Sequence, residues 1–444
     1  MGQARYKTLV DALAADIRSG KLTPGTRLPT HRTLAAKHGL ALVTASRVYA
    51  ELEAMGLVIG ETGRGTFVRD VALPEGLGID QQTVASDMVD LSFNYPALPG
   101  QAEMLRAALK QLAVSGDLDA LLRYQPHGGR PHERAIVARH LAGQGLKVDA
   151  GQVMITSGAQ HGLTVVAMAL LKPGDVVATD ALTYPGMKVL AELLRLELLA
   201  VPAEGDALDL HALERLCRQR RVSAVYVQPT VHNPLGWVMG LGHRQQLASL
   251  AQQHGLLLIE DAAYAFLAEN APPPLAALAP DSTVHVSGFS KNIATGLRVG
   301  YVAAPQAWVP RIERAIRAST WNTPSVMTAL VCGWLDDGTV HALEVAKRKD
   351  ARQRQALVAQ ALHGLPHEAH PASYFAWLPL PEGARADRVA SALLAQGISV
   401  TTAEPFCTAA PVPHAIRLAL GSVDLSMLRA ALQRVREVVE LSGV

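Results

Sequence analysis

Lys291 and Arg298 stand seven residues apart in the stretch VSGFSKNIATGLRVGY, residues 286–301. A lysine amine can form an imine with an aldehyde, and the planar fork of an arginine can hold two oxygens of a phosphate. The pair therefore suits a ligand that carries both an aldehyde and a phosphate. Taken alone, each of the two residues could equally be an ordinary surface charge.

Other polar residues follow apolar runs in the same part of the chain. In MITSGAQHGL, the residues Gly158, Ala159 and Gln160 open a predicted helix, so their backbone N–H groups can face a phosphate. Asp261 closes the apolar run GLLLIED, where a carboxylate needs a partner that offsets its desolvation, such as a protonated pyridine nitrogen. A plain tight turn and a helix cap are the alternative interpretations of these two motifs.

Two further residues suit the edge and the face of a flat ring. Asn233 in QPTVHNPLG can donate its amide to a phenolate oxygen. Tyr184 in ALTYPG can stack on the ring, although packing at a turn would also explain this tyrosine. Together with the phosphate turn, the aspartate and the lysine–arginine pair, they predict a site for pyridoxal 5'-phosphate.

A parallel sheet would bring these residues together. Five apolar, β-prone runs alternate with helical segments along residues 89–444: QVMIT, DVVAT, SAVYVQ, GLLLIED and STVHVS. Strands that alternate with helices predict an α/β fold with a mostly parallel sheet flanked by helices. In such a sheet ligands gather at the carboxyl ends of the strands, which is where the polar residues fall.

The first 70 residues follow a different pattern. Leu9, Leu13 and Ile17 at four-residue spacing predict one helix, Thr30 is placed to cap a short second helix, and LVTASRVYAELEAMG predicts a third. The stretch LVIGETGRGTFVRD then predicts two short strands around a glycine-rich tip. This order is typical of a winged helix-turn-helix that binds double-stranded DNA, and a small helical domain that binds another protein is the alternative.

Length and charge agree with more than one domain. A chain of 444 residues exceeds one ordinary core, and 49% of its residues are hydrophobic against 18% charged, as in a globular protein. Residues 1–70 hold ten Lys or Arg and six Asp or Glu, a net +4, whereas the rest of the chain carries −2. We expect a DNA-binding domain at residues 1–70, a linker at 71–88 and a ligand-binding domain at 89–444.

Cysteine spacing and hydropathy exclude several other classes of protein. Cys217, Cys332 and Cys407 lie too far apart for a typical zinc site or disulfide framework, so no metal is expected. The first twenty residues carry charges throughout, and no apolar run approaches the ~20 residues that a membrane helix needs. We expect a cytoplasmic protein with no membrane partner.

The N-terminal segments PGTRLPTHRTLAAKHGL, SRVYAELEAMGLV and GRGTFV resemble the winged-helix domain of the GntR family of bacterial transcription regulators. The resemblance implies DNA contacts from the supporting helix, the recognition helix and the wing. The residues at the matching positions are Arg32, Thr44, Ser46, Arg47 and Arg64. The family usually begins its recognition helix with Ser or Thr and then Arg, whereas this chain has Ala41 and Leu42, so we expect an atypical operator.

Residues 89–444 resemble fold type I aminotransferases, which add a smaller C-terminal α/β subdomain to the large sheet, and the fusion resembles the MocR subfamily of regulators. The resemblance implies that Lys291 is the Schiff-base lysine, that Asp261 pairs with the pyridine nitrogen, and that Tyr184 stacks on the ring. The implied partners of the ring oxygen are Asn233 and Tyr264, and those of the phosphate are Gly158, Ala159, Gln160, Ser290 and Arg298.

Two further positions, one arginine and one tyrosine, extend the resemblance beyond the cofactor. Arg417, in HAIRLALG, matches the arginine that binds an amino acid's carboxylate, although an arginine on a late strand is usually only a surface charge. Tyr124, in RYQPHGG, resembles the tyrosine that reaches the phosphate of the neighbouring subunit. The resemblance therefore implies a homodimer with shared sites.

Two departures from the aminotransferase pattern concern the cofactor and the substrate. Gly288 stands three residues before Lys291, where the family commonly has Ser or Thr, so Ser287 or Ser290 must supply that hydroxyl or one bond to the phosphate is lost. The stretch SFNYPALPG lacks the glycine often seen beside the substrate.

Two functions of different classes fit the sequence. The first is a transcription regulator that responds to pyridoxal phosphate itself, or to an amino acid or amine that joins it. The second is a working aminotransferase, because a lysine base, an electron-sink aspartate and a carboxylate-binding arginine are all retained. The winged helix favours the regulator, and slow transamination is compatible with it.

Overall fold

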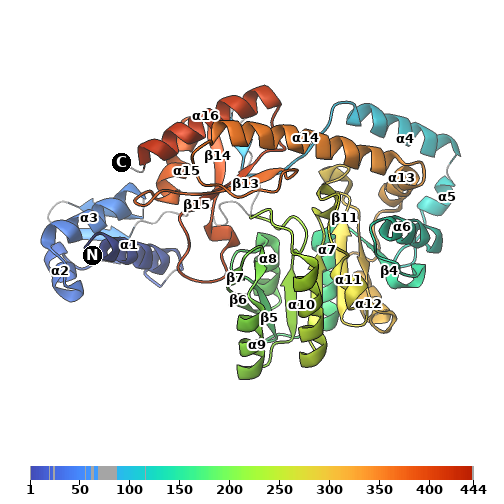
Figure 1. The fold of residues 1–444 in the computed structure, drawn as a ribbon, viewed down its shortest axis with the longest axis horizontal. Helices are drawn as coiled ribbons and strands as arrows, with labels where there is room; N and C mark the ends of the chain where they lie inside the picture. Colours follow the sequence, from blue (N-terminus) through green and yellow to red (C-terminus); the bar gives the residue numbers. More distant parts are fainter. Residues whose placement is uncertain are drawn as a thin grey trace. The chain divides into compact units, whose positions relative to one another are not determined.

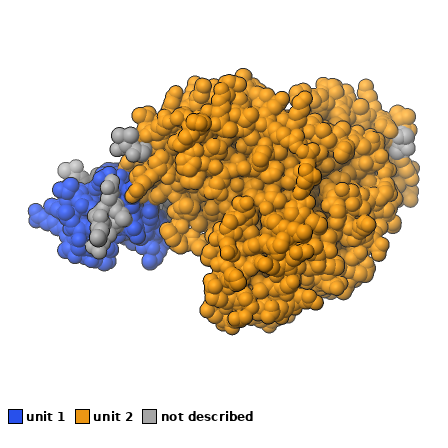
Figure 2. Space-filling model, viewed as in Figure 1, with its two compact units in different colours: residues 1–80 blue, residues 81–444 orange. Residues whose placement is uncertain are grey.

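The computed structural model describes residues 2–19, 21–23, 26–55, 57–61, 65–68, 88–115 and 117–442. The chain divides into two compact units, residues 1–80 and 81–444, which have different colours in Figure 2. The expected linker, residues 71–88, lies outside the described residues except for Met88.

Within its described residues the N-terminal unit contains three helices and a hairpin, in the predicted order. The elements are α1 (Gly2–Arg18), α2 (His31–His38), α3 (Leu42–Ala54), β1 (Val58–Glu61) and β2 (Gly65–Val68). The two strands pair antiparallel. Thr30 caps α2 as predicted, because its hydroxyl accepts a hydrogen bond from Thr33 N at 3.2 Å. Gly39 ends the helix at φ +62°, in the left-handed region that glycine adopts without strain.

The core of this unit differs in one detail from the sequence prediction. The buried face of α1 is centred on Tyr6, Val10 and Ala14, and it packs with Val48 and Leu52 of α3. The expected row at positions 9, 13 and 17 lies beside this face and is only partly buried. Both rows have four-residue spacing, so the periodicity could not decide which of them faces α3.

The larger unit is built on a seven-stranded sheet with the strand order β4-β12-β11-β10-β9-β5-β6. Its strands are β4 (Val153–Thr156), β5 (Val176–Asp180), β6 (Glu197–Val201), β9 (Ala224–Val227), β10 (Leu257–Asp261), β11 (Thr283–Gly288) and β12 (Gly300–Ala303). The described neighbours pair in parallel except at β12, which is antiparallel to both β11 and β4. The five predicted runs all become strands, which confirms the mostly parallel sheet.

Helices cover both faces of this sheet, as Figure 1 shows. The helices of this part of the chain are α4 (Gln101–Ser115), α5 (Leu118–Leu121), α6 (Pro131–Gly143), α7 (Ala159–Leu170), α8 (Pro185–Leu193), α9 (Leu210–Gln219), α10 (Leu241–His254), α11 (Leu275–Leu278), α12 (Val309–Ser319) and α13 (Ser325–Asp336), of which α4 packs on α13. Tyr226 and Ile259 pack with α7 and α12, whereas Val225 and Leu258 pack with α9 and α10 on the opposite face. Strands buried on both faces explain why their sequences read as continuous apolar runs.

Short elements complete this part of the chain. A two-stranded ribbon is formed by β7 (Ala203–Glu204) and β8 (Ala207–Leu208). The 3-10 turns are η1 (Ala150–Gln152), η2 (Ala265–Leu267), η3 (Thr295–Leu297), η4 (Gln306–Trp308) and η5 (Glu404–Phe406).

A second sheet, with the order β13-β15-β14-β3, forms the smaller subdomain. Its elements are β13 (Phe375–Pro379), β14 (Ile398–Thr402), β15 (Ala415–Ala419), β3 (Val89–Leu91), α15 (Ala386–Ala395) and α16 (Leu425–Ser442). The long helix α14 (Thr339–Ala361) packs on α16 at one end and on α13 at the other (Figure 1). The predicted C-terminal subdomain thus also contains β3, the first strand of the unit along the chain, which pairs in parallel with β14.

The described residues bear on two other classes of protein, membrane proteins and metalloproteins. None of the described helices is both long and apolar enough to cross a membrane. No group of three or more His, Cys, Asp or Glu is placed to hold a metal ion in the part of the chain that the structure describes.

Candidate functional site

The predicted cofactor residues follow the carboxyl ends of neighbouring strands. Gly158 comes two residues after β4, Tyr184 four residues after β5, Asn233 six residues after β9, and Lys291 three residues after β11, while Asp261 is the last residue of β10. Because β5, β9, β10 and β11 run in parallel, their carboxyl ends meet at one edge of the sheet.

Gly158 and Arg298 form a cradle at the N-terminus of α7. Gly158 has φ +90° and precedes the helix, and a Cβ on it would lie 2.7 Å from Nη2 of Arg298. Nη1 of Arg298 donates to Ser290 Oγ at 3.2 Å. Ala159 begins the helix, so backbone N–H groups, a guanidinium and a hydroxyl converge where a phosphate was predicted.

The two serines that could compensate for Gly288 have different partners. Ser287 is buried, and its hydroxyl donates to the carbonyl of Ala262 at 3.1 Å, away from Arg298. Ser290 is the serine that contacts the arginine. A Cβ at Gly288 would lie 3.1 Å from the backbone nitrogen of Ala159, so glycine allows the start of α7 to approach β11 closely.

Asp261 is buried at the end of β10 and is held by three donors. Its Oδ2 accepts from Tyr226 at 2.7 Å and from Gln228 Nε2 at 3.1 Å, and its Oδ1 accepts from the backbone of Ala263 at 3.0 Å. Burial raises the pKa of Asp261 above its usual range, and the hydrogen bonds from Tyr226, Ala263 and Gln228 act in the opposite direction. A positively charged ring nitrogen would favour the ionised carboxylate further.

Tyr184 precedes α8 and lies close to the other charged and phenolic groups of the site. Burial raises the pKa of its hydroxyl well above the usual range, Asp261 and Tyr264 raise it further, and Arg298 lowers it. A Cβ on Gly186 would lie 2.4 Å from both the Tyr184 ring and Gln160 Oε1, so these side chains pack around this glycine. The amide of Gln160 donates to Gly186 O at 3.0 Å.

Lys291 points into the same site. Its amine lies 5.7 Å from the ring centroid of Tyr264, and it donates a hydrogen bond to the carbonyl of Asn94 at 3.0 Å. Lys291 is half-buried, which argues against an ordinary surface charge. Tyr264 is itself buried, with its ring 5.1 Å from that of Phe375.

The cradle at Gly158 and the chemistry of the donors fit pyridoxal phosphate. A Cβ at Gly158 would fill the space beside Arg298 at the start of α7, where a phosphate can accept from backbone N–H groups and a guanidinium. A carboxylate for the ring nitrogen, an amide for the ring oxygen, an amine for the aldehyde and a cradle for the phosphate are all present.

Arg417 is not a surface charge. It lies on β15, is only 6% exposed, and donates to the carbonyl of Ser92 and to Thr401 Oγ1, the latter at 3.4 Å. Its Nε is buried without a partner among the described residues, and its guanidinium lies 5.3 Å from the ring centroid of Phe406. Burial lowers its pKa, so a carboxylate partner would be favourable here.

Tyr124 is the predicted residue that stays outside its own chain's site. Its side chain is 85% exposed, and its ring lies 5.3 Å from that of Trp321. An exposed hydroxyl is compatible with a contact to another subunit, which remains a prediction.

The predicted DNA contacts occupy different environments on α2 and α3. Arg32 is exposed, and Thr44 is half-buried. The hydroxyl of Ser46 lies 2.9 Å from Nδ1 of His31, so it joins the two helices. Arg47 is exposed and lies 4.7 Å above the ring of Tyr6. Arg64, at the predicted wing tip, lies outside the described residues.

Family models match both parts of the chain. Residues 86–435 match the model described as aminotransferase class I and II. The chain belongs to the aminotransferase class I and II family. Pyridoxal phosphate is therefore its cofactor, in agreement with the predicted site. Residues 5–68 match bacterial regulatory proteins of the gntR family, so this aminotransferase-family chain carries a GntR-type helix-turn-helix and has the organisation of the MocR subfamily.

Curated relatives share this organisation. The HTH-type transcriptional regulator YdeF of Bacillus subtilis is 28% identical over 421 residues, which cover 94% of this chain and 90% of that protein. The HTH-type pyridoxine biosynthesis transcriptional regulator PdxR of Corynebacterium glutamicum is 25% identical over 98% of this chain and 95% of its own length.

Among solved structures, an archaeal alanine:glyoxylate aminotransferase matches with a TM-score of 0.75. It is 23% identical and covers 80% of this chain and 91% of its own. At this identity the likeness supports the fold alone, and it agrees with the fold type I prediction.

The sequence prediction for this aminotransferase-family site missed four residues. Tyr226 and Gln228 hold Asp261, and the register of β9 beside β10 places Tyr226 next to Ile259. Asn94 and Lys347 contact Lys291 from distant parts of the chain. The alternation in SAVYVQ could have identified Tyr226 and Gln228 as neighbours on one face, whereas no local pattern identifies the other two.

Proposed function

We propose that this protein is a DNA-binding transcription regulator whose aminotransferase-like domain binds pyridoxal phosphate at Lys291 and uses it as the signal. The observation that carries the proposal is the combination, in one chain, of a GntR-type helix-turn-helix with an aminotransferase-family domain. The aminotransferase-like domain does not need a DNA-binding domain to hold a cofactor, and the helix-turn-helix does not need a cofactor site to bind DNA. The names of YdeF and PdxR support the same conclusion.

The proposed roles follow from the contacts. When bound, pyridoxal phosphate supplies an aldehyde that reacts with an amine and a ring that withdraws electrons. Lys291 provides the amine, and Asp261, fixed by Tyr226 and Gln228, holds a proton on the ring nitrogen. The phosphate is held by Arg298, Ser290 and the N-terminal backbone of α7.

The proposed signal is either the cofactor or an adduct of the cofactor with an amino acid or amine. A regulator needs only a ligand that binds one arrangement of the protein better than another. The buried guanidinium of Arg417 favours a carboxylate, and hence an amino-acid effector. If Arg417 has only a structural role, the cofactor alone suffices as the signal.

Two proposed partners complete this function. Arg32, Thr44, Ser46, Arg47 and Arg64 are the proposed contacts to double-stranded DNA. The second partner is another copy of the chain, because Tyr124 is exposed here and would reach the phosphate of a neighbouring subunit. We further propose that the protein acts in the cytoplasm.

The test is a titration of purified protein onto DNA from upstream of its own gene and of the neighbouring divergent gene, with and without pyridoxal phosphate. Salt and protein concentration are held fixed, because phosphate contacts make affinity salt-dependent. We expect specific binding that shifts when the cofactor is added. Specific binding that ignores the cofactor would point to an amino-acid or amine effector, and the absence of specific binding would contradict regulation.

A second candidate function is transamination. It is favoured by the retention of Lys291, Asp261 and Arg417, which are the base, the electron sink and the carboxylate site that turnover requires. Incubation with a panel of amino acids and a 2-oxo acid acceptor, followed by detection of new amino acids, tests it directly. Turnover that persists without DNA would establish an enzyme in addition to, or in place of, the regulator.

A further inference from the structure

One stretch of backbone beside the cofactor site accepts hydrogen bonds from three cationic side chains. This stretch, segment 92–96, directly follows β3 and contributes every second carbonyl to these bonds. The bonds run from Arg417 Nη2 to Ser92 O, from Lys291 Nζ to Asn94 O at 3.0 Å, and from Lys347 Nζ to Pro96 O at 2.7 Å.

Lys347, on α14, is the donor with the largest number of backbone partners. Its side chain is fully buried, and its amine also donates to the carbonyls of Lys291 at 2.9 Å and Ile293 at 2.7 Å. Burial lowers the pKa of Lys347 to about 7, and the charge of Lys291 lowers it in the same direction. Only the charged ammonium form has three N–H groups, one for each carbonyl. In this form Lys347 links the backbone of Lys291 to that of Pro96 through hydrogen bonds.

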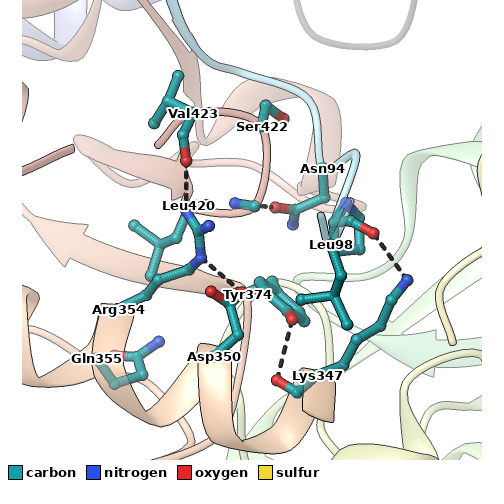
Figure 3. A network of polar contacts seen from close by, with 12 residues as sticks. Asn94, Leu98, Lys347, Asp350, Arg354, Gln355, Tyr374, Leu420, Ser422 and Val423 are labelled. Atoms are coloured by element: carbon teal, nitrogen blue, oxygen red, sulfur yellow. Dashed lines mark hydrogen bonds and ion pairs between the residues drawn. The ribbon is translucent and has the colours of Figure 1, made fainter. Parts of the chain in front are cut away.

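Segment 92–96 also forms hydrogen bonds with the turn that follows β15. Gly421 N donates to Asn94 Oδ1 at 3.3 Å, and Tyr95 N donates to Ser422 Oγ at 3.1 Å. Ser422 in turn donates to Phe93 O. Figure 3 shows Asn94 between this turn and Lys347, whose own carbonyl accepts from Tyr374 at 2.9 Å.

Two of the three cationic donors are those that the ligand needs. The amine of Lys291 is required for the aldehyde of the cofactor, and the guanidinium of Arg417 is required for a carboxylate. Lys291 cannot keep its present bond to Asn94 O when its amine reacts with the aldehyde. Arg417, by contrast, has five N–H donors and can keep its bond to Ser92 O while its Nε, unpaired among the described residues, meets a carboxylate. Lys347 has no such role, so the bond to Pro96 can persist.

We propose that segment 92–96 senses occupancy of the cofactor site, with Lys347 as the positioning residue that fixes its far end. This rests on the proposed function. Cofactor binding removes the Lys291 amine from the carbonyl of Asn94. The carbonyls on either side keep donors, since Ser92 O also accepts from Thr401 Oγ1 at 3.2 Å and Pro96 O accepts from Lys347. The near end of the segment continues into β3, the first strand after the linker, so the change arises where the chain enters the larger unit.

The first experiment compares Lys347→Met with Lys349→Met in the full-length protein. Lys349 is an exposed residue of the same helix and provides the matched control. Both variants are saturated with pyridoxal phosphate, which is checked by the visible absorbance of the bound cofactor, and DNA affinity is measured with and without it. We expect wild type and Lys349→Met to respond equally, and Lys347→Met to bind the cofactor more weakly and to lose the DNA response at saturation.

A Lys347→Met variant that saturates and still shifts DNA affinity as wild type does would overturn the inference. A wild type that does not respond would instead contradict the proposed function, so the two failures are distinguishable.

The second experiment needs no variant and covers the case in which Lys347→Met does not fold or wild type gives no DNA response. Hydrogen exchange of the wild-type peptide that contains Tyr95 is followed with and without pyridoxal phosphate. We expect exchange of this peptide to become about fivefold faster or more when the cofactor binds, because the segment loses a charge-assisted hydrogen bond at Asn94. A peptide from α9 is the control and should be unaffected. Unchanged or slower exchange at Tyr95 would refute the proposal.

Discussion

We propose that cofactor binding depends on Lys291. It is half-buried and directed at Tyr264, and no other amine in the described part of the site is placed to replace it, because Lys347 is committed to three carbonyls. We predict that Lys291→Ala removes the visible absorbance of the bound cofactor and abolishes the ligand response while the fold is retained. Absorbance spectra and circular dichroism check this, and an unchanged spectrum would refute the assignment.

We expect the stability of the cofactor-free protein to depend on pH through Asp261. Burial raises its folded-state pKa above the unfolded value, so its contribution to stability is fully present below about pH 4 and is lost as the pH rises through the folded pKa. We predict that Asp261→Asn removes this loss. The melting temperature of the cofactor-free variant, relative to wild type, should therefore be higher at pH 8 than at pH 4.

The same substitution should weaken binding of the cofactor. Loss of a charged partner for the ring nitrogen costs about 2 kcal/mol, or ~30-fold in affinity. Thermal shift and a spectroscopic titration measure the two effects on one preparation. A relative melting temperature that does not vary with pH, or an affinity equal to that of wild type, would contradict the role given to this carboxylate.

At the scale of single residues, the sequence predicted those members of the candidate site that belong to a local motif. Lys291, Asp261 and Asn233 each sit in a motif at a strand end, so a parallel sheet was enough to unite them. Tyr226 was missed because its contact with Asp261 depends on the register between β9 and β10. Lys347 was missed because it lies 56 residues from Lys291, in a charge-rich helix where no local pattern distinguishes the buried lysine from its neighbours.

The recognition helix α3 begins with apolar residues that face solvent. Ala41 is its N-cap without a side-chain hydrogen bond, and Leu42 and Val43 are 47% and 81% exposed. In the GntR pattern this turn carries a hydroxyl and an arginine. An exposed apolar turn on an element that enters the major groove suits the methyl group of thymine, which is the apolar feature of that groove.

We therefore predict that thymine methyls contribute to operator affinity. Replacing each contacted thymine by uracil should weaken binding about fourfold. This factor corresponds to ~0.8 kcal/mol, the free energy of burying one methyl-sized group. Leu42→Ala should lose this discrimination and serves as the matched variant. Equal affinity of wild type for the two DNAs would show that the apolar turn does not read bases.

Arg47 provides a second test on the same helix. It is exposed but lies over the ring of Tyr6, so it must keep or exchange this contact when DNA binds. If it meets a phosphate, Arg47→Ala should weaken binding to all sequences and reduce the salt slope by about 1. An unchanged slope would restrict Arg47 to packing on α1.

Elements were predicted better than their faces. The three N-terminal helices, the hairpin and the five central strands all follow from periodicity and turn residues. Which row of α1 is buried, and the pairing of β3 with a C-terminal sheet, depend on tertiary contacts that no local window contains. The place of β3 in that sheet matters for function. Because β3 pairs with β14, and β14 with β15, the sheet connects the linker side of the chain to the strand that carries Arg417.

At the scale of the whole molecule, we propose that a second copy binds at the exposed apolar residues near Tyr124. Large apolar side chains stand exposed along α4, α5 and the loop that follows: Leu109, Val114, Leu118, Leu122 and Tyr124. Exposed apolar residues of this size favour an interface. In the proposed dimer, Tyr124 would reach the phosphate of the other subunit, as the family resemblance implies.

Mixed dimers test whether the sites are shared. Tyr124→Phe should bind pyridoxal phosphate about 30-fold more weakly, since it loses one hydrogen bond to a charged phosphate, and Lys291→Ala should not form the covalent linkage at all. In a dimer of one Tyr124→Phe subunit and one Lys291→Ala subunit, the site with the intact lysine also receives the intact tyrosine. Mixing the two inactive proteins should therefore create a population with wild-type cofactor affinity, detected by absorbance at limiting cofactor. If the mixture behaves as the sum of its parts after subunit exchange is verified by mass, each site is complete within one chain and the exposed surface serves assembly alone.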